Sequence, residues 1–218
     1  MINLSLAKKG GGPITILCLG AHSDDIEIGC GGSILQLQKT YGNLHIHWVV
    51  FSAAGVRGEE ARKSAGLFTA GCKSEIVLKE YRDGFFPYNG AAIKSEFEDI
   101  KGHVTPDVVF THWRNDAHQD HRLLSELTFN TFRNHLVLEY EIPKYDGDIG
   151  QPSVFIPLPE PVPERKVDCL MEAFDSQRRT KPWFDRATFM GLMRIRGMES
   201  NAPSGFAEAF HCRKLVLL

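Results

Sequence analysis

Two short runs of the sequence concentrate side chains that can bind a metal ion or move a proton. The first run contains His22, Asp24 and Asp25, and the second contains His118, Asp120 and His121. His22 and Asp25 are three residues apart, so they can lie on one side of a helix start, and the second run repeats that spacing. Two histidines and one aspartate leave positions open for water and substrate, as catalytic zinc requires. The same donors could hold Fe(II), so ligand type alone leaves the metal open.

Each polar run follows a segment with the pattern of a buried strand. Residues 14–19 form a continuous apolar, β-branched-rich stretch, and residues 106–111 form a second one. Such stretches are typical of strands that are buried on both faces of a parallel sheet. Open α/β sheets place their ligands at the carboxyl ends of their strands. The two runs are therefore expected to meet at one edge of the sheet.

Strands and helices alternate along the chain. Strands are expected at residues 14–19, 45–52, 76–78, 106–111, 136–138, 154–156 and 214–218, and helices at about 24–38, 59–69, 93–104, 121–132, 164–174 and 186–196. This alternation predicts a Rossmann-like, doubly wound α/β fold with a mainly parallel sheet and helices on both faces. A chain of 218 residues suits a single domain.

The first expected helix contains Gly29, Gly31 and Gly32. An interior glycine costs a helix about 0.8–1.0 kcal/mol relative to alanine. We therefore expect something to pack tightly against this helix, since local rules are most often broken at functional sites. A nucleotide phosphate is disfavoured, because the third glycine position of the dinucleotide fingerprint holds Ile34 and no Gly-Lys-Ser/Thr follows.

Composition narrows the function classes. With 25 basic and 27 acidic residues the formal charge is -2, which argues against a nucleic-acid partner. The five cysteines are odd in number and contain no Cys-x-x-Cys pair, so a reduced, cytoplasmic setting is expected. No segment approaches the roughly 18 apolar residues of a membrane span, and we expect a soluble protein.

The two polar runs resemble the signatures of one known family. The sequence His22-Ser23-Asp24-Asp25 is similar to a His-Pro-Asp-Asp motif, and residues 118–121, His-Gln-Asp-His, are similar to a His-Pro-Asp-His motif. Both motifs belong to the PIG-L/LmbE family of metal-dependent N-deacetylases, and the resemblance covers residues 14–132. Members of that family remove acetyl groups from N-acetylglucosaminyl compounds.

The resemblance implies a role for each motif residue. By analogy, zinc (or Fe²⁺) would be bound by His22, Asp25 and His121, Asp24 would be the general base, His118 would stand near the scissile carbonyl, and Asp120 would hold a histidine in orientation. Ser23 and Gln119 replace the usual prolines. Because proline restricts the residue before it, the neighbouring histidines are expected to be held less rigidly here.

Other positions resemble the family less closely. Arg57 and Asp83 resemble family positions near the sugar, although an ion pair with a neighbouring glutamate and a plain Asp-Gly turn are the alternatives. Weaker local resemblance places Arg194, Glu208 and His211 at the cleft. We expect His45 and His47 to be ordinary strand residues. The aromatic loop at residues 81–90 could form a pocket wall or fold back on the core.

Together these features predict a zinc-dependent N-deacetylase that acts on an N-acetylglucosamine-type amino sugar or glycoside. One alternative is an amidase that cleaves a non-sugar or thiol-conjugate amide with the same metal site. Another is a non-catalytic sugar-binding homologue, although such a protein would not need Asp24 as a base. Family analogy also suggests a homo-oligomer. The aglycone, the pathway and the group that protonates the leaving amine are left open.

Overall fold

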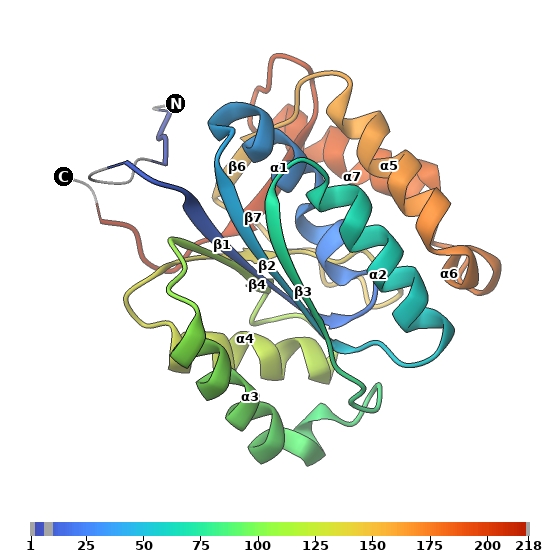
Figure 1. The fold of residues 1–218 in the computed structure, drawn as a ribbon. Helices are drawn as coiled ribbons and strands as arrows, with labels where there is room; N and C mark the ends of the chain where they lie inside the picture. The colour runs from blue at the N-terminus through green and yellow to red at the C-terminus, as the bar shows by residue number, and fades with distance from the viewer. Residues whose placement is uncertain (1–2, 7–10, 217–218) are drawn as a thin grey trace.

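A mixed sheet forms the centre of the molecule (Figure 1). The computed structural model describes residues 3–6 and 11–216. Its strands are β1 (Ile14–His22), β2 (Leu44–Ser52), β3 (Lys73–Leu78), β4 (Val108–His112), β5 (Leu136–Tyr140), β6 (Val154–Pro157) and β7 (Ala207–His211). They form a seven-stranded sheet in the order β3-β2-β1-β4-β5-β7-β6. The first five strands in that order are paired in parallel, and β7 runs antiparallel to both its neighbours.

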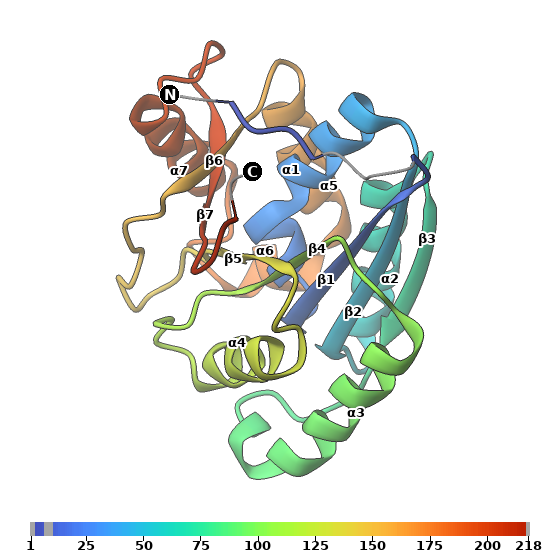
Figure 2. The same cartoon turned by 90° about the vertical axis from the view of Figure 1, so that its left-hand side faces the viewer.

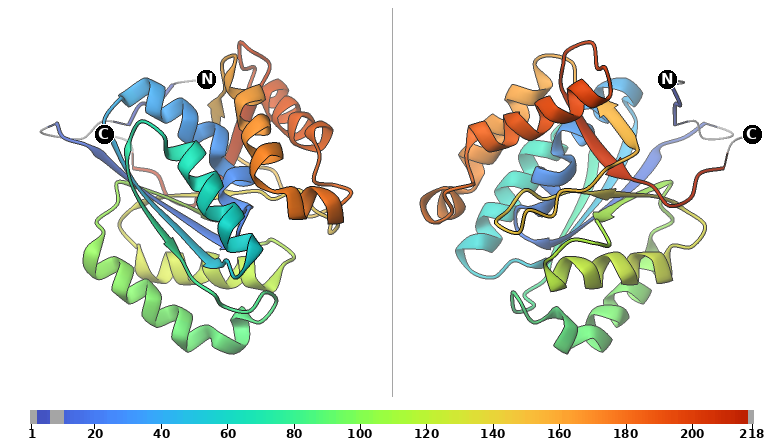
Figure 3. Two further views of the ribbon diagram at one scale, coloured as in Figure 1. Left: turned by 45° about the vertical axis from the view of Figure 1, so that its right-hand side comes forward. Right: turned by 180° about the vertical axis from the view of Figure 1, so that it is seen from behind.

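Helices cover both faces of the sheet (Figures 2 and 3). One face carries α1 (Asp25–Tyr41), α2 (Val56–Thr69), α5 (Val162–Ala173), α6 (Asp175–Thr180) and α7 (Arg186–Glu199). The other carries the short 3-10 helix η1 (Phe86–Asn89), α3 (Gly90–His103) and α4 (Gln119–Thr131). The predicted doubly wound α/β architecture is confirmed. Among the described residues, no helix is long and apolar enough to cross a membrane.

Each face of the sheet has its own hydrophobic core, because successive side chains of a strand point to opposite faces. On β2, Trp48 joins the cluster under α1 and α2, and its ring lies 6.3 Å from that of Phe68. Phe51, on the opposite face, stacks on Phe97 of α3 at 5.4 Å. Burial on both faces explains why the central strands are apolar almost throughout.

The strand order brings the two polar runs together. The chain builds β1, β2 and β3 in one direction, and β4 then returns to the other side of β1. The order thus reverses between β1 and β4, which is the switch point where open α/β sheets bind ligands. His22 is the last residue of β1, and α4, which follows β4, begins at Gln119.

The prediction of a closing strand at residues 214–218 is wrong. Residues 214–216 lie in no strand, and residues 217 and 218 fall outside the described residues. The strand that closes this side of the sheet is β7, whose Ala-Glu-Ala start has low strand propensity and was therefore overlooked. Its Glu208 is buried by a tertiary partner, Lys166, which no local pattern indicates. Helix α6 was also not predicted.

Tight packing against α1 is confirmed. A methyl group at Gly29 would lie 2.2 Å from Cδ2 of Tyr140, and one at Gly31 would lie 2.6 Å from the Phe68 ring. At Gly32 it would lie 2.9 Å from Glu208 Oε1. These glycines are needed because aromatic rings and a carboxylate approach the helix backbone closely. Residues of the protein itself, from β5, α2 and β7, occupy the space beside the helix.

Candidate active site

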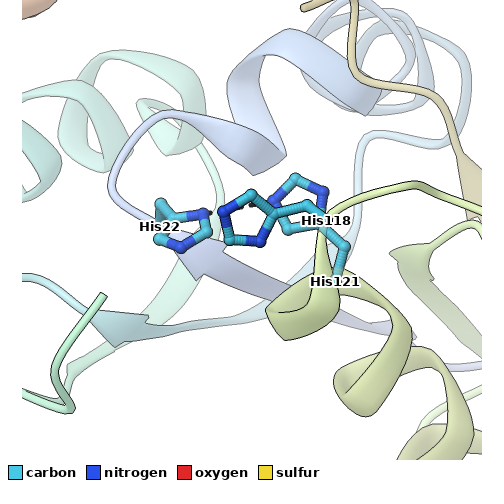
Figure 4. A group of neighbouring side chains, drawn as sticks. All are labelled: His22, His118 and His121. Atoms are coloured by element: carbon cyan, nitrogen blue, oxygen red, sulfur yellow. Dashed lines mark hydrogen bonds between the residues drawn. The ribbon is translucent and has the colours of Figure 1, made fainter. Parts of the chain in front are cut away.

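Three side chains from two separate segments form the centre of the site. His22 ends β1, Asp25 is the first residue of α1, and His121 lies in the first turn of α4. All three are buried, with exposed fractions of 6%, 3% and 2%. Figure 4 shows the rings of His22, His118 and His121 gathered between the end of β1 and the start of α4.

The donor atoms of these three side chains converge. His22 Nδ1 lies 3.3 Å from Asp25 Oδ2 and 3.1 Å from His121 Nε2, and the latter two atoms are 3.5 Å apart. Donors about 2.0–2.1 Å from a tetrahedral ion are separated by roughly 3.3 Å. The triangle therefore has the size that a tetrahedral metal requires, and two imidazoles with one carboxylate are suitable ligands.

Hydrogen bonds orient both histidines toward that point. His121 Nδ1 lies 2.9 Å from Asp116 Oδ2, so its N–H donates to this carboxylate and leaves Nε2 free to bind an ion. His22 Nε2 lies 3.3 Å from Asp120 Oδ2, which likewise leaves Nδ1 free. His22 Nδ1 and His121 Nε2 are 3.1 Å apart, a separation that suits two ligands of one cation. Asp116 lies two residues before His118, and no role was predicted for it.

The electrostatics of the three donors differ. Burial alone would raise the pKa of Asp25, but His121, His112 and His22 outweigh it and hold that pKa well below its usual range. Burial lowers the pKa of His121 to about 4, so the ring is neutral and can bind a metal at pH 7. His22 is also buried, yet the nearby carboxylates of Asp25 and Asp120 raise its pKa well above the usual value. A metal ion must therefore displace a proton at this ring.

Asp24 stands at the N-cap of α1 but does not cap the helix. Aspartate is a favoured N-cap because its carboxylate accepts backbone N–H groups, whereas Asp24 Oδ1 instead lies 3.2 Å from Arg57 Nη2. Burial raises the pKa of Asp24, Arg57 partly offsets this, and the charge of Asp25 adds to the increase. A buried carboxylate with a raised pKa beside a metal site is suited to accept a proton.

His118 and Asp120 occupy the start of α4. His118 is the N-cap, and its Nδ1 accepts the backbone N–H of Asp120 at 3.3 Å, so the proton of the neutral ring is on Nε2. Burial and the charge on His22 lower its pKa. The Asp120 carboxylate accepts the N–H groups of Gly84 at 2.7 Å and Phe86 at 3.1 Å. Asp120 was expected to orient a histidine, and the histidine that its carboxylate contacts is His22, with Nε2 at 3.3 Å from Asp120 Oδ2.

Ser23 and Gln119, which replace the two motif prolines, form hydrogen bonds to neighbouring segments. Ser23 is fully buried and its Oγ donates to the carbonyl of Ser52 at the end of β2, at 3.3 Å. Gln119 Nε2 donates to the carbonyl of Gly84 at 3.1 Å. Hydrogen bonds to neighbouring segments therefore hold both motif turns, where the motif would rely on the rigidity of proline.

Arg57 and Asp83 lie at the mouth of the site. Arg57 bridges two carboxylates, with Nη2 at 3.2 Å from Asp24 and Nη1 at 3.3 Å from Asp83. Asp83 Oδ1 lies 3.0 Å from His22 Nε2, and that hydrogen bond lowers the Asp83 pKa to about 2. Its side chain is 52% exposed and is the part of the cluster most open to a ligand.

The aromatic loop follows Asp83 and divides its rings between core and surface. Phe86 is fully buried, whereas Phe85 and Tyr88 are 37% and 82% exposed. The loop backbone donates two hydrogen bonds to the Asp120 carboxylate. Phe86 folds back on the core as one alternative predicted, and the pocket wall stays a prediction.

His112 is a further residue of the site, and no role was predicted for it from the sequence. It is fully buried at the end of β4, stacks on His121 with ring centroids 3.9 Å apart, and places Nε2 3.2 Å from Asp25 Oδ2. The same nitrogen lies 2.9 Å from the backbone N of Ala21 and 3.2 Å from Tyr140 Oη. His112 therefore contacts two candidate ligands, His121 and Asp25, and helps to hold them in place. The sequence signal that could have identified His112 is its position at the end of a buried strand, where α/β sheets place their ligands.

Weaker resemblance suggested three cleft residues, Arg194, Glu208 and His211, and the structure gives each of them contacts elsewhere. Glu208 is buried in an ion pair with Lys166 at 2.6 Å and accepts the N–H groups of Gly32 and Ser33. Arg194 donates to the carbonyl of Gly205 at 3.0 Å. His211 stacks on Trp113 with centroids 4.4 Å apart. Among the contacts of the described residues, none of the three reaches a candidate ligand.

Histidines and aspartates that converge at the switch point of an α/β sheet are typical of an enzyme with a metal centre. Residues 17–132 match the model of the PIG-L family, described as GlcNAc-PI de-N-acetylase. The chain belongs to this family. Both polar runs lie inside the matched segment.

One curated relative and two solved structures are similar to this chain. The uncharacterized deacetylase YaiS of Escherichia coli K12 is 33% identical over 153 residues, which cover 64% of this chain and 78% of that protein. N,N'-diacetylchitobiose deacetylase from Pyrococcus horikoshii has a similar fold, with a TM-score of 0.68 and 20% identity over 91% of this chain and 83% of that one. GalB of Pseudomonas putida KT2440, a 4-carboxy-2-hydroxymuconate hydratase, has a TM-score of 0.69 and 16% identity over 94% and 98% of the two chains. The fold therefore supports more than one reaction.

Proposed function

We propose that this protein is a metal-dependent N-deacetylase that hydrolyses the acetamide of an N-acetylglucosamine-type amino sugar or glycoside. The observation that supports it most is the convergence of three donor atoms 3.1–3.5 Å apart, with the buried Asp24 next in sequence to one of them. Membership of the PIG-L family supports the choice of an N-acetylglucosamine-type substrate.

In this proposal His22, Asp25 and His121 hold the ion, and Zn²⁺ is the occupant we propose, with Fe²⁺ as the alternative. A divalent ion there would polarise the acetamide carbonyl and acidify the attacking water. Asp116 and Asp120 keep the two imidazoles oriented through their outer nitrogens. Such outer carboxylates also make the ligating nitrogens more basic.

Asp24 is the general base of the proposed reaction. It takes a proton from the attacking water, and the oxygen adds to the acetamide carbon. Its raised pKa brings it nearer to neutral pH than an exposed aspartate, which improves proton transfer. Collapse of the tetrahedral intermediate breaks the C–N bond, and the amine leaves with a proton. Acetate and the free amino sugar are the products.

His118 stabilises the negative charge that develops on the carbonyl oxygen. With Nδ1 accepting from the backbone, its Nε2–H is the donor that remains for the substrate. A preorganised donor of this kind is worth about 3–4 kcal/mol in comparable sites. Arg57 and Asp83, which lie at the mouth, bind the hydroxyl groups of the sugar.

The test compares Asp24→Asn with wild type. We expect wild type to release acetate from a panel of N-acetylglucosamine compounds, and the variant to lose roughly 10²–10⁴-fold in kcat/KM while it retains the same metal content. Asp146→Asn, which changes an exposed aspartate in the loop after β5, is the matched control and keeps full activity. Full activity in Asp24→Asn would refute the base assignment.

The substrate panel also separates the deacetylase from other amidases. It includes N-acetylglucosamine, its glycosides, and non-sugar and thiol-conjugate acetamides. Acetate release only from the non-sugar compounds would favour the amidase. Metal-loaded protein that binds the sugars but releases no acetate would favour a non-catalytic homologue.

We place the enzyme in the cytoplasm, because its five cysteines are odd in number and include no Cys-x-x-Cys pair. Subcellular fractionation tests this, and recovery from an oxidising compartment would contradict it. Family analogy favours a homo-oligomer, which sedimentation equilibrium measures.

A further inference from the structure

A second cluster of metal-binding side chains lies on strands β2 and β3. His45 Nε2 is 3.2 Å from Glu75 Oε1, and His47 Nδ1 is 3.4 Å from Glu75 Oε2. The two imidazole rings have centroids 4.3 Å apart. One donor atom from each residue lies within 4.8 Å of the others. This cluster takes no part in the site described above.

Strand geometry explains why these three side chains meet. His45 and His47 are two residues apart on β2, so they project from the same face of the sheet. Glu75 lies directly opposite His47 in the parallel register of β2 and β3. Val49 and Phe51, further along the same face, pack in the cluster with Phe97 of α3. The histidines lie at the other end of β2, and their side chains keep 17% and 11% of their surface exposed.

We propose that His45, His47 and Glu75 bind a divalent transition-metal ion, with Zn²⁺ as the first candidate. Two imidazoles and one carboxylate are ligands that suit zinc, copper and nickel. The distances between the nitrogens and the Glu75 oxygens, 3.2 and 3.4 Å, are close to the separation of roughly 3.3 Å between donors of a tetrahedral ion. The remaining coordination positions face solvent and take water.

This site is separate from the candidate active site. His22 pairs with Ser52 in the register of β1 and β2, and His47 lies five residues before Ser52. At about 3.3 Å per residue, the two sites are roughly 16 Å apart along the strand. An ion at the second site therefore cannot touch the substrate of the first. Its role is to link the edge strand β3 to β2.

The local charges are compatible with a cation. Glu75 supplies one negative charge, and Lys73 lies opposite His45 as the nearest opposing positive group on β3.

The test counts bound ions. Metal-free protein is dialysed against micromolar Zn²⁺, and bound zinc per chain is measured by elemental analysis for wild type, His45→Asn, Glu75→Gln and His103→Asn. We expect each of the first two variants to bind one ion fewer than wild type. His103→Asn changes an exposed histidine at the end of α3 and should match wild type. The difference is independent of whether the active site itself binds zinc.

A second readout identifies the ligands. Cu²⁺ bound at this site should show electron paramagnetic resonance splitting from two imidazole nitrogens, reduced to one in His45→Asn. Circular dichroism checks that the variants fold, and both substitutions are at partly or fully exposed positions. Equal zinc content in wild type, His45→Asn and Glu75→Gln would overturn the proposal. So would binding that needs millimolar zinc.

Discussion

His121 Nδ1 lies 2.9 Å from Asp116 Oδ2, and both side chains are 3% exposed. Asp116 Oδ1 also lies 3.0 Å from Lys144 Nζ and accepts the backbone N–H of His118 at 2.8 Å. Burial alone would raise the pKa of Asp116, but the hydrogen bond and charge of His121, together with His112 and Lys144, outweigh it and hold that pKa well below its usual range, so this carboxylate stays ionised. Asp116 therefore fixes the orientation of the ring whose Nε2 is a proposed metal ligand.

Asp116→Asn is expected to weaken zinc affinity at the candidate active site by about 10–100-fold, because an amide is a poorer acceptor for the imidazole N–H. Competition with a chromogenic chelator measures this, in a Glu75→Gln background so that only one site reports. Asp148→Asn is the matched control, since Asp148 contacts the same Lys144 but no ligand histidine. Equal zinc affinity in Asp116→Asn and Asp148→Asn would contradict the positioning role.

Arg57→Met is expected to move the acidic limb of the kcat/KM profile to higher pH. The Arg57 charge opposes the rise in the pKa of Asp24 that burial produces, so its removal raises that pKa further. The base acts when ionised, so activity is present above the Asp24 pKa and is lost as pH falls through it. Arg62→Met, an exposed arginine on the same helix, is the control. If the acidic limb lies at the same pH in Arg57→Met and Arg62→Met, the proposed effect of the Arg57 charge on the pKa of Asp24 is refuted.

Gly29→Ala is expected to lower the free energy of unfolding by about 1–3 kcal/mol, because the added methyl group would lie 2.2 Å from the Tyr140 ring. Gly66→Ala provides the contrast. Gly66 is exposed in α2 with no atom near the position of the methyl group, so alanine there should raise the free energy of unfolding by roughly 0.8–1 kcal/mol. Denaturant titration measures both, and unchanged stability in Gly29→Ala would show that the ring can move away.

Lys166→Met is expected to destabilise the fold by about 3–5 kcal/mol, because it leaves the buried Glu208 carboxylate without its cation. Lys166 also donates to the carbonyl of Ile28 at 2.6 Å, within α1. The double variant Lys166→Met/Glu208→Gln should recover much of the loss, since no buried charge remains. Lys63→Met breaks an ion pair exposed on both sides and should change stability by less than about 1 kcal/mol. A small loss in Lys166→Met would indicate that water reaches Glu208.

Much of the fold could be predicted from local patterns. Residues 14–19 are largely apolar on both faces because β1 is buried between two helix layers, and this pattern predicted both the strand and the parallel sheet. β7 could not be predicted in this way. Its Glu208 is buried only because Lys166, 42 residues earlier in the chain, reaches it. For the same reason the sequence did not predict that Glu208 would be held by Lys166 and the backbone of α1.

The sequence by itself determined the donor types: residues 22, 24 and 25 and residues 118, 120 and 121 are spaced so that each run can face one point. Only the tertiary structure decided that both runs face the same point. Strand β4 returns to lie beside β1, which brings His121 within 3.1 Å of His22 across 99 residues of chain. The supporting roles of Asp116 and His112 likewise depend on which nitrogen of each ring faces its neighbour, and spacing along a chain does not specify that.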